Sequence, residues 1–238
     1  MMTKGKRRGL IAVMIIAGAV AVAALVIIFG FKTKKIVYEG NTRLEDAQIT
    51  EYVFGGKLPN SIIYKLFGKK NKHVPFVKSY DVSIQDPGTL KLTIHEREYL
   101  GFFKTEAGNN YFDDSGTVTD ISDKVIDGVV EIDGLKFISV EEGADISAAN
   151  EEMKEKIMSF AKAFNEHQIP SEKISFDENG DVSIKIKDVT VLCGSDEYAE
   201  EKMDRLNRIV PEMEDLKGIL HLESFDGTEK NIYFNKLD

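Results

Sequence analysis

The chain has 238 residues, of which 42% are hydrophobic and 30% charged, a composition that excludes an intrinsically disordered protein. The net charge of −9 is unevenly distributed, because residues 101–238 hold 15 Lys and Arg against 32 Asp and Glu, whereas residues 32–100 hold 12 against 8. The acidic C-terminal part argues against binding to nucleic acid, and the asymmetry suggests two domains.

An uncharged apolar run from Leu10 to Phe31 follows a basic tail, residues 1–9, that holds four basic residues and no acidic one. At about 1.5 Å per residue the run would span roughly 33 Å, which matches a hydrocarbon core of about 30 Å. The sequence predicts a transmembrane helix over 10–31. A cleaved signal peptide is the alternative, since residues 19–21 read A-V-A, but its apolar region would be only about 7–15 residues long.

The denser basic cluster precedes this run, although Lys32, Lys34 and Lys35 follow it. The positive-inside rule therefore predicts a single-pass protein of the cell membrane with a cytoplasmic N-terminus and an extracytoplasmic body.

Residues 32–98 have the pattern of a small α/β domain. A short strand at 35–41 ends in a Gly-Asn turn, and residues 42–57 then show helical spacing, with Asn41 or Thr42 as the expected cap and Gly55-Gly56 as the end. A second helix is expected to start at Pro59 or Asn60 and to end at Gly68. Alternating strands at 75–85 and 89–98 complete the order β-α-α-β-β, the pattern of a POTRA domain.

The run His-Glu-Arg-Glu at residues 95–98 raises the question of catalysis. Strand alternation points Glu96 to the inner face and His95 and Arg97 to the outer face, so that Glu96 and Arg97 cannot converge on one substrate atom. We interpret the run as a solvated strand end, with a partner contact as the alternative.

Residues 99–238 have the pattern of a second domain with a mostly antiparallel sheet. Short strands are expected at 99–104, 109–113 and 116–121, a helix from Ser147 to Phe164, and a long helix from 195 to 216 with Ser195 as its N-cap. A hairpin between the helices should point alternate residues inward: Val182, Ile184, Ile186, Val189, Val191 and Cys193. The lone Cys193 excludes an intramolecular disulfide and is expected to be a buried, inert thiol.

The chain ends in a hairpin around Asp226-Gly227 whose last strand is expected at 231–234. A terminal strand with unpaired backbone groups can accept a strand from a partner. The candidate partner-binding residues are Ile232, Tyr233 and Phe234, backed by the strand Ile219–Glu223 with Ile219, His221 and Glu223. Ile232 and Phe234 share one face and are expected in the core, whereas Tyr233 should face outward.

Several features of the sequence resemble the FtsQ/DivIB family of bacterial cell-division proteins. They are the basic tail and single anchor, "IVYEGN" at 36–41, the set Pro75, Val77, Val82, Pro87, Thr89, Leu90, Ile94, Glu96 and Arg97, "YFDDSGTV" at 111–118, and the strand and helix of 189–210. Their order extends over about 200 residues, although Glu98-Tyr99 departs from the family pattern. The resemblance implies a scaffold whose second domain binds FtsB/DivIC-type and FtsL-type partners at its end.

The sequence shows no motif of a catalytic or metal site. H-E-x-x-H, P-loop, G-x-S-x-G and paired C-x-x-C motifs are absent, and the four histidines lack metal-ligand spacing. Residues 177–181 suggest a calcium loop, but Gly180 stands at the fourth position instead of the sixth. We expect no enzymatic activity, no cofactor, no metal and no small-molecule substrate.

A basic stretch marks the first domain and, with Arg97, forms a candidate contact surface: Lys65, Lys69, Lys70, Lys72 and Arg97. It is interpreted as a solvated face, with anionic lipid or an acidic partner as the alternative occupant.

The organisation predicted is a cytoplasmic tail at 1–9, a transmembrane helix at 10–31, a POTRA domain at 32–98 and a partner-binding β domain at 99–238. The expected function is that of a non-enzymatic scaffold of the division septum, which links its partners to septal wall synthesis. Two alternatives stay open. One is another POTRA-bearing export or envelope-assembly factor, and the other is a membrane-tethered wall enzyme.

Overall fold

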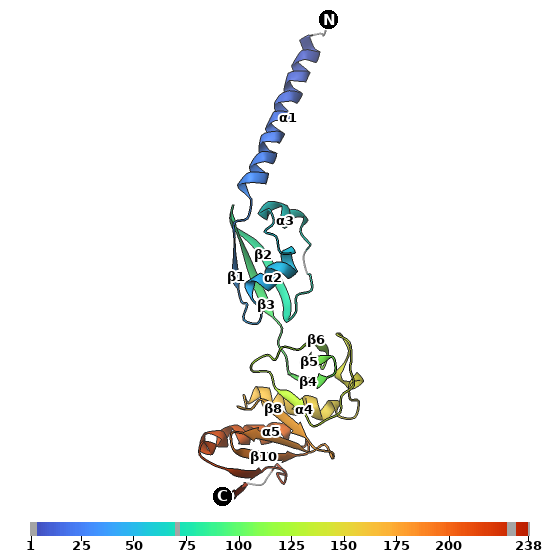
Figure 1. The fold of residues 1–238 in the computed structure, drawn as a ribbon, viewed down its shortest axis with the longest axis vertical. Helices are drawn as coiled ribbons and strands as arrows, with labels where there is room; N and C mark the ends of the chain where they lie inside the picture. The colour runs from blue at the N-terminus through green and yellow to red at the C-terminus, as the bar shows by residue number, and fades with distance from the viewer. Residues whose placement is uncertain (1–3, 70–71, 228–231, 238) are drawn as a thin grey trace. The chain divides into compact units, whose positions relative to one another are not determined.

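The computed structural model describes residues 4–69, 72–227 and 232–237. The chain divides into two compact units, Met1–Arg97 (unit 1) and Glu98–Asp238 (unit 2). Both units contain strands and helices, and most of the strand pairs are antiparallel, so the fold is α+β (Figure 1).

The first element of unit 1 is the helix α1, Lys4–Gly30. Its stretch Ile11–Gly30 is long and apolar enough to cross a membrane, and none of that stretch is buried. At about 1.5 Å per residue these 20 residues cover roughly 30 Å, the thickness of a hydrocarbon core. The helix begins at Lys4, ahead of the predicted span at 10–31.

Unit 1 continues as a three-stranded sheet with two helices. Its elements are β1 (Lys35–Glu39), α2 (Asp46–Phe54), α3 (Ser61–Phe67), β2 (Val77–Asp86) and β3 (Thr89–Glu96). The central strand β3 pairs in parallel with β1 and antiparallel with β2. Leu90, Leu92 and Ile94 of β3 are buried, as their alternation predicts, and Ile49 and Val53 of α2 belong to the core that includes Leu92 and Ile94.

The helix α2 begins later than the sequence suggested. Neither Asn41 nor Thr42 caps it, because the N-cap is Glu45, which forms a reciprocal capping box with Gln48. The side chain of Asn41 instead bonds within the preceding turn, to the backbone of Leu44. Gly55 ends α2 in a left-handed conformation, at φ 72°, as predicted.

The short helix α3 has the predicted ends. The Oδ1 of Asn60 accepts a hydrogen bond from the N–H of Ile63 at 3.1 Å, and Gly68 is the C-cap.

Unit 2 is built on one nine-stranded sheet. Its elements are β4 (Gly101–Thr105), β5 (Gly108–Phe112), β6 (Val118–Ser122), β7 (Glu131–Asp133), η1 (Ile146–Ala148), α4 (Lys154–Glu166), β8 (Lys173–Phe176), β9 (Val182–Ile186), β10 (Val189–Gly194), α5 (Ala199–Ile209), η2 (Val210–Met213), β11 (Gly218–His221) and β12 (Tyr233–Lys236). Across the sheet the order is β12-β11-β10-β9-β8-β7-β4-β5-β6.

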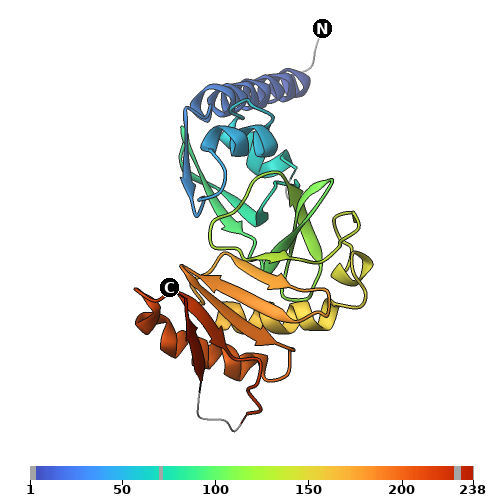
Figure 2. The same cartoon turned by 60° about the horizontal axis from the view of Figure 1, so that its bottom comes forward.

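The helices α4 and α5 lie against the same face of this sheet (Figure 2). Cross-strand neighbours on that face are buried, including Ile174, Ile184 and Val191. The helices contribute Phe160 and Leu206 to the same core. All six residues predicted to point inward from β9 and β10 are buried.

Both helices of unit 2 start later than predicted. A 3-10 turn capped by Asp145 occupies the position of the expected start at Ser147, and α4 begins at Lys154. Ser195 does not cap α5, which begins at Ala199 after Tyr198, a residue in the left-handed region at φ 59°. The long helix predicted to reach 216 ends at Ile209 and continues as the 3-10 turn η2.

The C-terminal hairpin is also shifted from its predicted bounds. The last strand was expected at 231–234, but β12 is Tyr233–Lys236, with Ile232 just before it and residue 231 outside the described residues. Its neighbour β11 is Gly218–His221 instead of Ile219–Glu223, so Glu223 follows the strand.

Candidate protein-binding edge at the C-terminal strand

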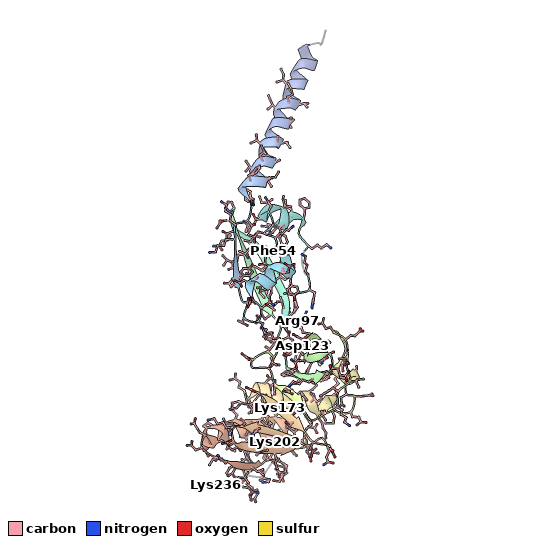
Figure 3. All side chains as sticks on the ribbon, in the orientation of Figure 1. Phe54, Arg97, Asp123, Lys173, Lys202 and Lys236 are labelled. Atoms are coloured by element: carbon pink, nitrogen blue, oxygen red, sulfur yellow. The ribbon has the colours of Figure 1, made fainter. Side chains whose placement is uncertain are left out.

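The C-terminal strand β12 lies at one edge of the nine-stranded sheet. It pairs antiparallel with β11 over four positions, from Gly218 opposite Lys236 to His221 opposite Tyr233. No strand of the described chain pairs with its other side. Lys236, labelled in Figure 3, is the last residue of this edge strand.

The register identifies which backbone groups of β12 face the open edge. The N–H of Leu237 donates to the carbonyl of Lys217 at 3.0 Å, and these residues stand directly opposite each other in the register. Because bonded and non-bonded pairs alternate in an antiparallel ladder, Tyr233 and Asn235 direct their backbone groups toward β11. Phe234 and Lys236 therefore direct theirs toward the open edge, where an added strand would bind.

The side chains of the terminal segment divide between the two faces of the sheet. Ile232 and Phe234 are half-buried and pack against the core of unit 2, whereas Tyr233 is 57% exposed. Phe234 lies opposite the buried Leu220 of β11. This is the distribution that the alternation of the sequence predicts, and it leaves Tyr233 as the large side chain of β12 that is exposed to a partner.

On the sheet face away from the helices, three polar side chains join β11 to β12. His221 Nδ1 is 2.6 Å from Glu223 Oε1, and Asn235 Nδ2 is 3.0 Å from His221 Nε2. In the tautomer that satisfies all three groups, Nδ1–H donates to the Glu223 carboxylate and Nε2 accepts from the Asn235 amide. His221 and Glu223, which the sequence offered as backing for the partner site, thus hold the edge strand in place together with Asn235.

An aromatic cluster beside the end of β11 was not predicted from the sequence. The rings of Tyr198 and Phe225 meet edge to face at 6.0 Å, and the Arg205 guanidinium lies 4.6 Å from the Phe225 ring centroid. Tyr198 is 43% exposed. Tyr and Arg are enriched at the centres of protein interfaces. Only the fold brings these residues together, so the sequence offered no signal for them.

The basic residues singled out in unit 1 do not form one uniform surface. Lys65 and Lys69 are exposed, and Lys70 lies outside the described residues. Lys72 is half-buried, and its Nζ donates to the Val53 carbonyl at the end of α2, at 2.7 Å. Arg97 is also half-buried and its Nε donates to the carbonyl of Val77 at 3.2 Å.

Glu96, the centre of the His-Glu-Arg-Glu run, is a structural clamp. Its carboxylate accepts hydrogen bonds from the backbone N–H groups of Thr42 and Arg43, at 2.7 and 2.8 Å, and from the Thr42 hydroxyl at 2.6 Å. The Nε of Arg43 lies 3.5 Å from the same carboxylate. The side chain points inward as predicted and is only 15% exposed, whereas His95 and Glu98 of the same run are exposed, so the strand end is solvated except at Glu96 and the half-buried Arg97.

These contacts also set the ionisation of Glu96. Burial opposes its charged form, but the hydrogen bonds from Thr42 and Arg43 and the Arg43 charge outweigh burial, so the pKa is lowered. A carboxylate held ionised by hydrogen bonds to a neighbouring loop is suited to fixing that loop.

Unit 2 buries two ionisable side chains that the proposed site does not use, Cys193 and Lys202. Cys193 is buried, and burial raises the pKa of its thiol to about 12. Lys202 of α5, labelled in Figure 3, is also buried, and its Nζ donates to the Ser195 carbonyl at 2.8 Å. Burial lowers the pKa of Lys202. A thiol with so high a pKa is a poor nucleophile, and the lysine holds the loop between β10 and α5.

No family model matches this sequence, and no curated protein matches it either.

Proposed function

We propose that this chain is a membrane-anchored, non-enzymatic scaffold of the FtsQ/DivIB type that acts at the bacterial division septum. In this proposal α1 anchors the chain with its N-terminus in the cytoplasm, and the rest of unit 1 and all of unit 2 lie outside the membrane. Unit 2 binds FtsB/DivIC-type and FtsL-type proteins and links them to septal wall synthesis.

The observation that carries the proposal is the open edge of β12. A partner strand could bond to the backbone groups of Phe234 and Lys236 and contact Tyr233 with its side chains. The order β-α-α-β-β in unit 1, with β1 and β2 on either side of β3, supports its assignment as a POTRA domain. The four basic residues in the first turns of α1, ahead of its apolar stretch, support the orientation in the membrane.

The test is a binding measurement on the full-length chain in detergent with purified FtsB/DivIC- and FtsL-type partners. Lys236→Pro removes an N–H that points to the open edge and leaves the bonds to β11 in place. Lys236→Ala is the matched control, since it loses the same side chain and keeps the N–H. We expect the proline variant to bind at least tenfold more weakly than the alanine variant.

A second variant tests the contact surface of the same strand. Tyr233→Ala should weaken binding without lowering the melting temperature, because this side chain is mostly exposed. Equal binding by both Lys236 variants would place the partner site elsewhere. If the unmodified chain binds neither partner, the assignment to this division family is wrong.

A further inference from the structure

The strongest unexplained feature of unit 1 is an apolar surface on the short helix α3. Outside α1, five large apolar or aromatic side chains of the described part of unit 1 are exposed, and only one of them, Tyr52, lies away from α3. The other four lie on α3 or just before it: Leu58 (47%), Ile63 (46%), Leu66 (68%) and Phe67 (81%).

Three of these side chains form one face. Ile63, Leu66 and Phe67 stand at positions i, i+3 and i+4, which a helix brings to the same side. On another side of α3, Ser61 is buried and Tyr64 packs against the core of unit 1, where its ring meets Phe54 (labelled in Figure 3) at 4.8 Å. A helix that is apolar on both its inner and its outer side is typical of a site buried in protein or in lipid.

The structure ties the beginning of α3 to the end of α1. Asn60 Nδ2 donates to the carbonyl of Ile27 at 2.7 Å, and the N–H of Ser61 donates to the carbonyl of Phe31 at 2.9 Å. These carbonyls belong to the last turn of α1 and the residue after it, where the apolar stretch ends (Figure 1). The first residue of α3 is therefore fixed at the edge of the proposed hydrocarbon core.

Because α3 is short, the rest of the helix also stays close to the edge of the proposed hydrocarbon core. Seven residues at about 1.5 Å each extend only about 10 Å, and the interfacial region of a bilayer is roughly 5–7 Å deep on each side. Leu66 and Phe67 are thus within reach of the boundary between headgroups and acyl chains.

The charges around this surface also suit a membrane. Residues 1–38 and 52–80 contain no Asp or Glu, and three lysines are exposed in α3 or close to its ends: Lys57, Lys65 and Lys69. Lysines beside an apolar helix face attract anionic headgroups while their stems lie along apolar surface.

We propose that α3 is a second membrane contact, which lies in the outer interface of the bilayer with Ile63, Leu66 and Phe67 inserted and Lys65 and Lys69 among the headgroups. The occupant of this surface is the lipid bilayer itself. The inference rests on the proposed anchoring by α1 and not on the role in division.

The test places an environment-sensitive fluorophore on the full-length chain in nanodiscs that hold one copy each, with nitroxide-labelled lipids as quenchers. Single copies exclude contact between two chains. Cys193→Ala provides the background for probes at Lys69→Cys, two residues after the end of α3, Val22→Cys in α1 and Lys78→Cys, an exposed position of β2. We expect strong quenching at 22, at least half as much at 69, and little at 78.

A paired variant shows whether the apolar face causes the insertion. Leu66→Ser/Phe67→Ser should reduce quenching at 69 by at least threefold, without unfolding unit 1, because both side chains are mostly exposed. Replacement of anionic by zwitterionic lipid should weaken quenching at 69 and leave it unchanged at 22.

The outcomes separate the two proposals. Quenching at 22 with none at 69 overturns the contact by α3 and leaves the anchor intact. No quenching at 22 overturns the anchor, and the contact by α3 with it. A probe at 69 that is protected in native membranes but water-exposed in nanodiscs would mean that a protein covers this face, which also overturns the proposal.

Discussion

The side-chain amide of Asn60 donates a hydrogen bond to the carbonyl oxygen of Ile27, at 2.7 Å. Through its Oδ1 the same amide accepts from the N–H of Ile63 and caps α3. The last carbonyls and the first N–H groups of a helix have no hydrogen-bond partner within that helix. The Asn60 side chain thus satisfies one such carbonyl at the end of α1 and one such N–H at the start of α3.

Two substitutions at this position separate its two roles. Asn60→Ala should lose both bonds, which costs about 1 kcal/mol for the cap alone, and should speed hydrogen exchange at the amides of Ser61 and Ile63. Asn60→Asp keeps an oxygen that accepts from the N–H of Ile63 but loses the N–H group that donates to the carbonyl of Ile27. Only the amide of Ser61, which bonds to the carbonyl of Phe31 just after α1, should therefore exchange faster. Exchange at wild-type rates in both variants would show that Asn60 stabilises neither helix end.

Glu96→Gln should destabilise unit 1 by about 1–2 kcal/mol, because one of the two carboxylate acceptors and the charge are lost. The folded pKa of Glu96 is below the unfolded value, which is about 4.3. Its stabilising effect is therefore complete above that value and is lost as the pH falls through the lowered pKa. Hydrogen exchange of the amides of Leu92 and Ile94 in increasing urea measures the change at neutral pH.

The matched control for this prediction is Glu39→Gln. Glu39 pairs with Lys91 at 2.7 Å on an exposed surface, and the hydrogen bond and charge of Lys91 lower its pKa. An exposed pair adds little to stability, so this variant should remain close to the wild type. Equal effects at both positions would contradict the role of Glu96 as a clamp.

Cys193 should make unit 2 less stable at alkaline pH. Its folded pKa of about 12 exceeds the unfolded value of about 8.5, so the unfolded chain loses a proton that the folded chain keeps. Cys193→Ala should cost about 1 kcal/mol at pH 7, and the difference should move in favour of the alanine variant by up to about 2 kcal/mol at pH 10, enough to remove or reverse the deficit. Urea unfolding of both proteins at the two pH values checks this, and an unchanged deficit would contradict it.

Lys187→Asn should stabilise unit 2 by about 0.5–1 kcal/mol. Lys187 and Asp188 form the two-residue turn between β9 and β10, and Lys187 has φ 53°, a conformation that Asn tolerates better than Lys. Its ion pair with Glu214 joins two exposed side chains, so its loss should matter little. Lys185→Asn, on the adjoining strand, is the control and should give no gain in melting temperature.

The sequence predicted strands better than helix starts, for a physical reason. Alternating burial repeats along a strand, so each residue of the row from Leu90 to Ile94 confirms the assignment of the others. A helix start depends on one capping residue, and several candidates compete within a few positions. Thr42 was a plausible cap for α2, but its N–H and hydroxyl bond to Glu96, which lies 54 residues away in the sequence.

The contacts of the candidate site depended on pairings that the sequence does not reveal. Alternation sufficed to separate Tyr233 from Ile232 and Phe234. The edge position of β12, however, requires β11 to pair in parallel with β10 on its other side. The short strands β7 and β8, with three and four residues, were too brief to show a pattern of their own.

The parallel pairing of β1 with β3 also determines how unit 1 carries mechanical tension. The chain enters the three-stranded sheet of unit 1 at the start of β1, after α1, and leaves it at the end of β3, so a pull between α1 and unit 2 acts at opposite ends of two parallel neighbours. Such a force shears the five paired positions from Lys35–Thr89 to Glu39–Thr93 together instead of opening them one at a time. The sheet of unit 1 should therefore resist a pull along the chain better than a sheet whose strand pairs open one after another.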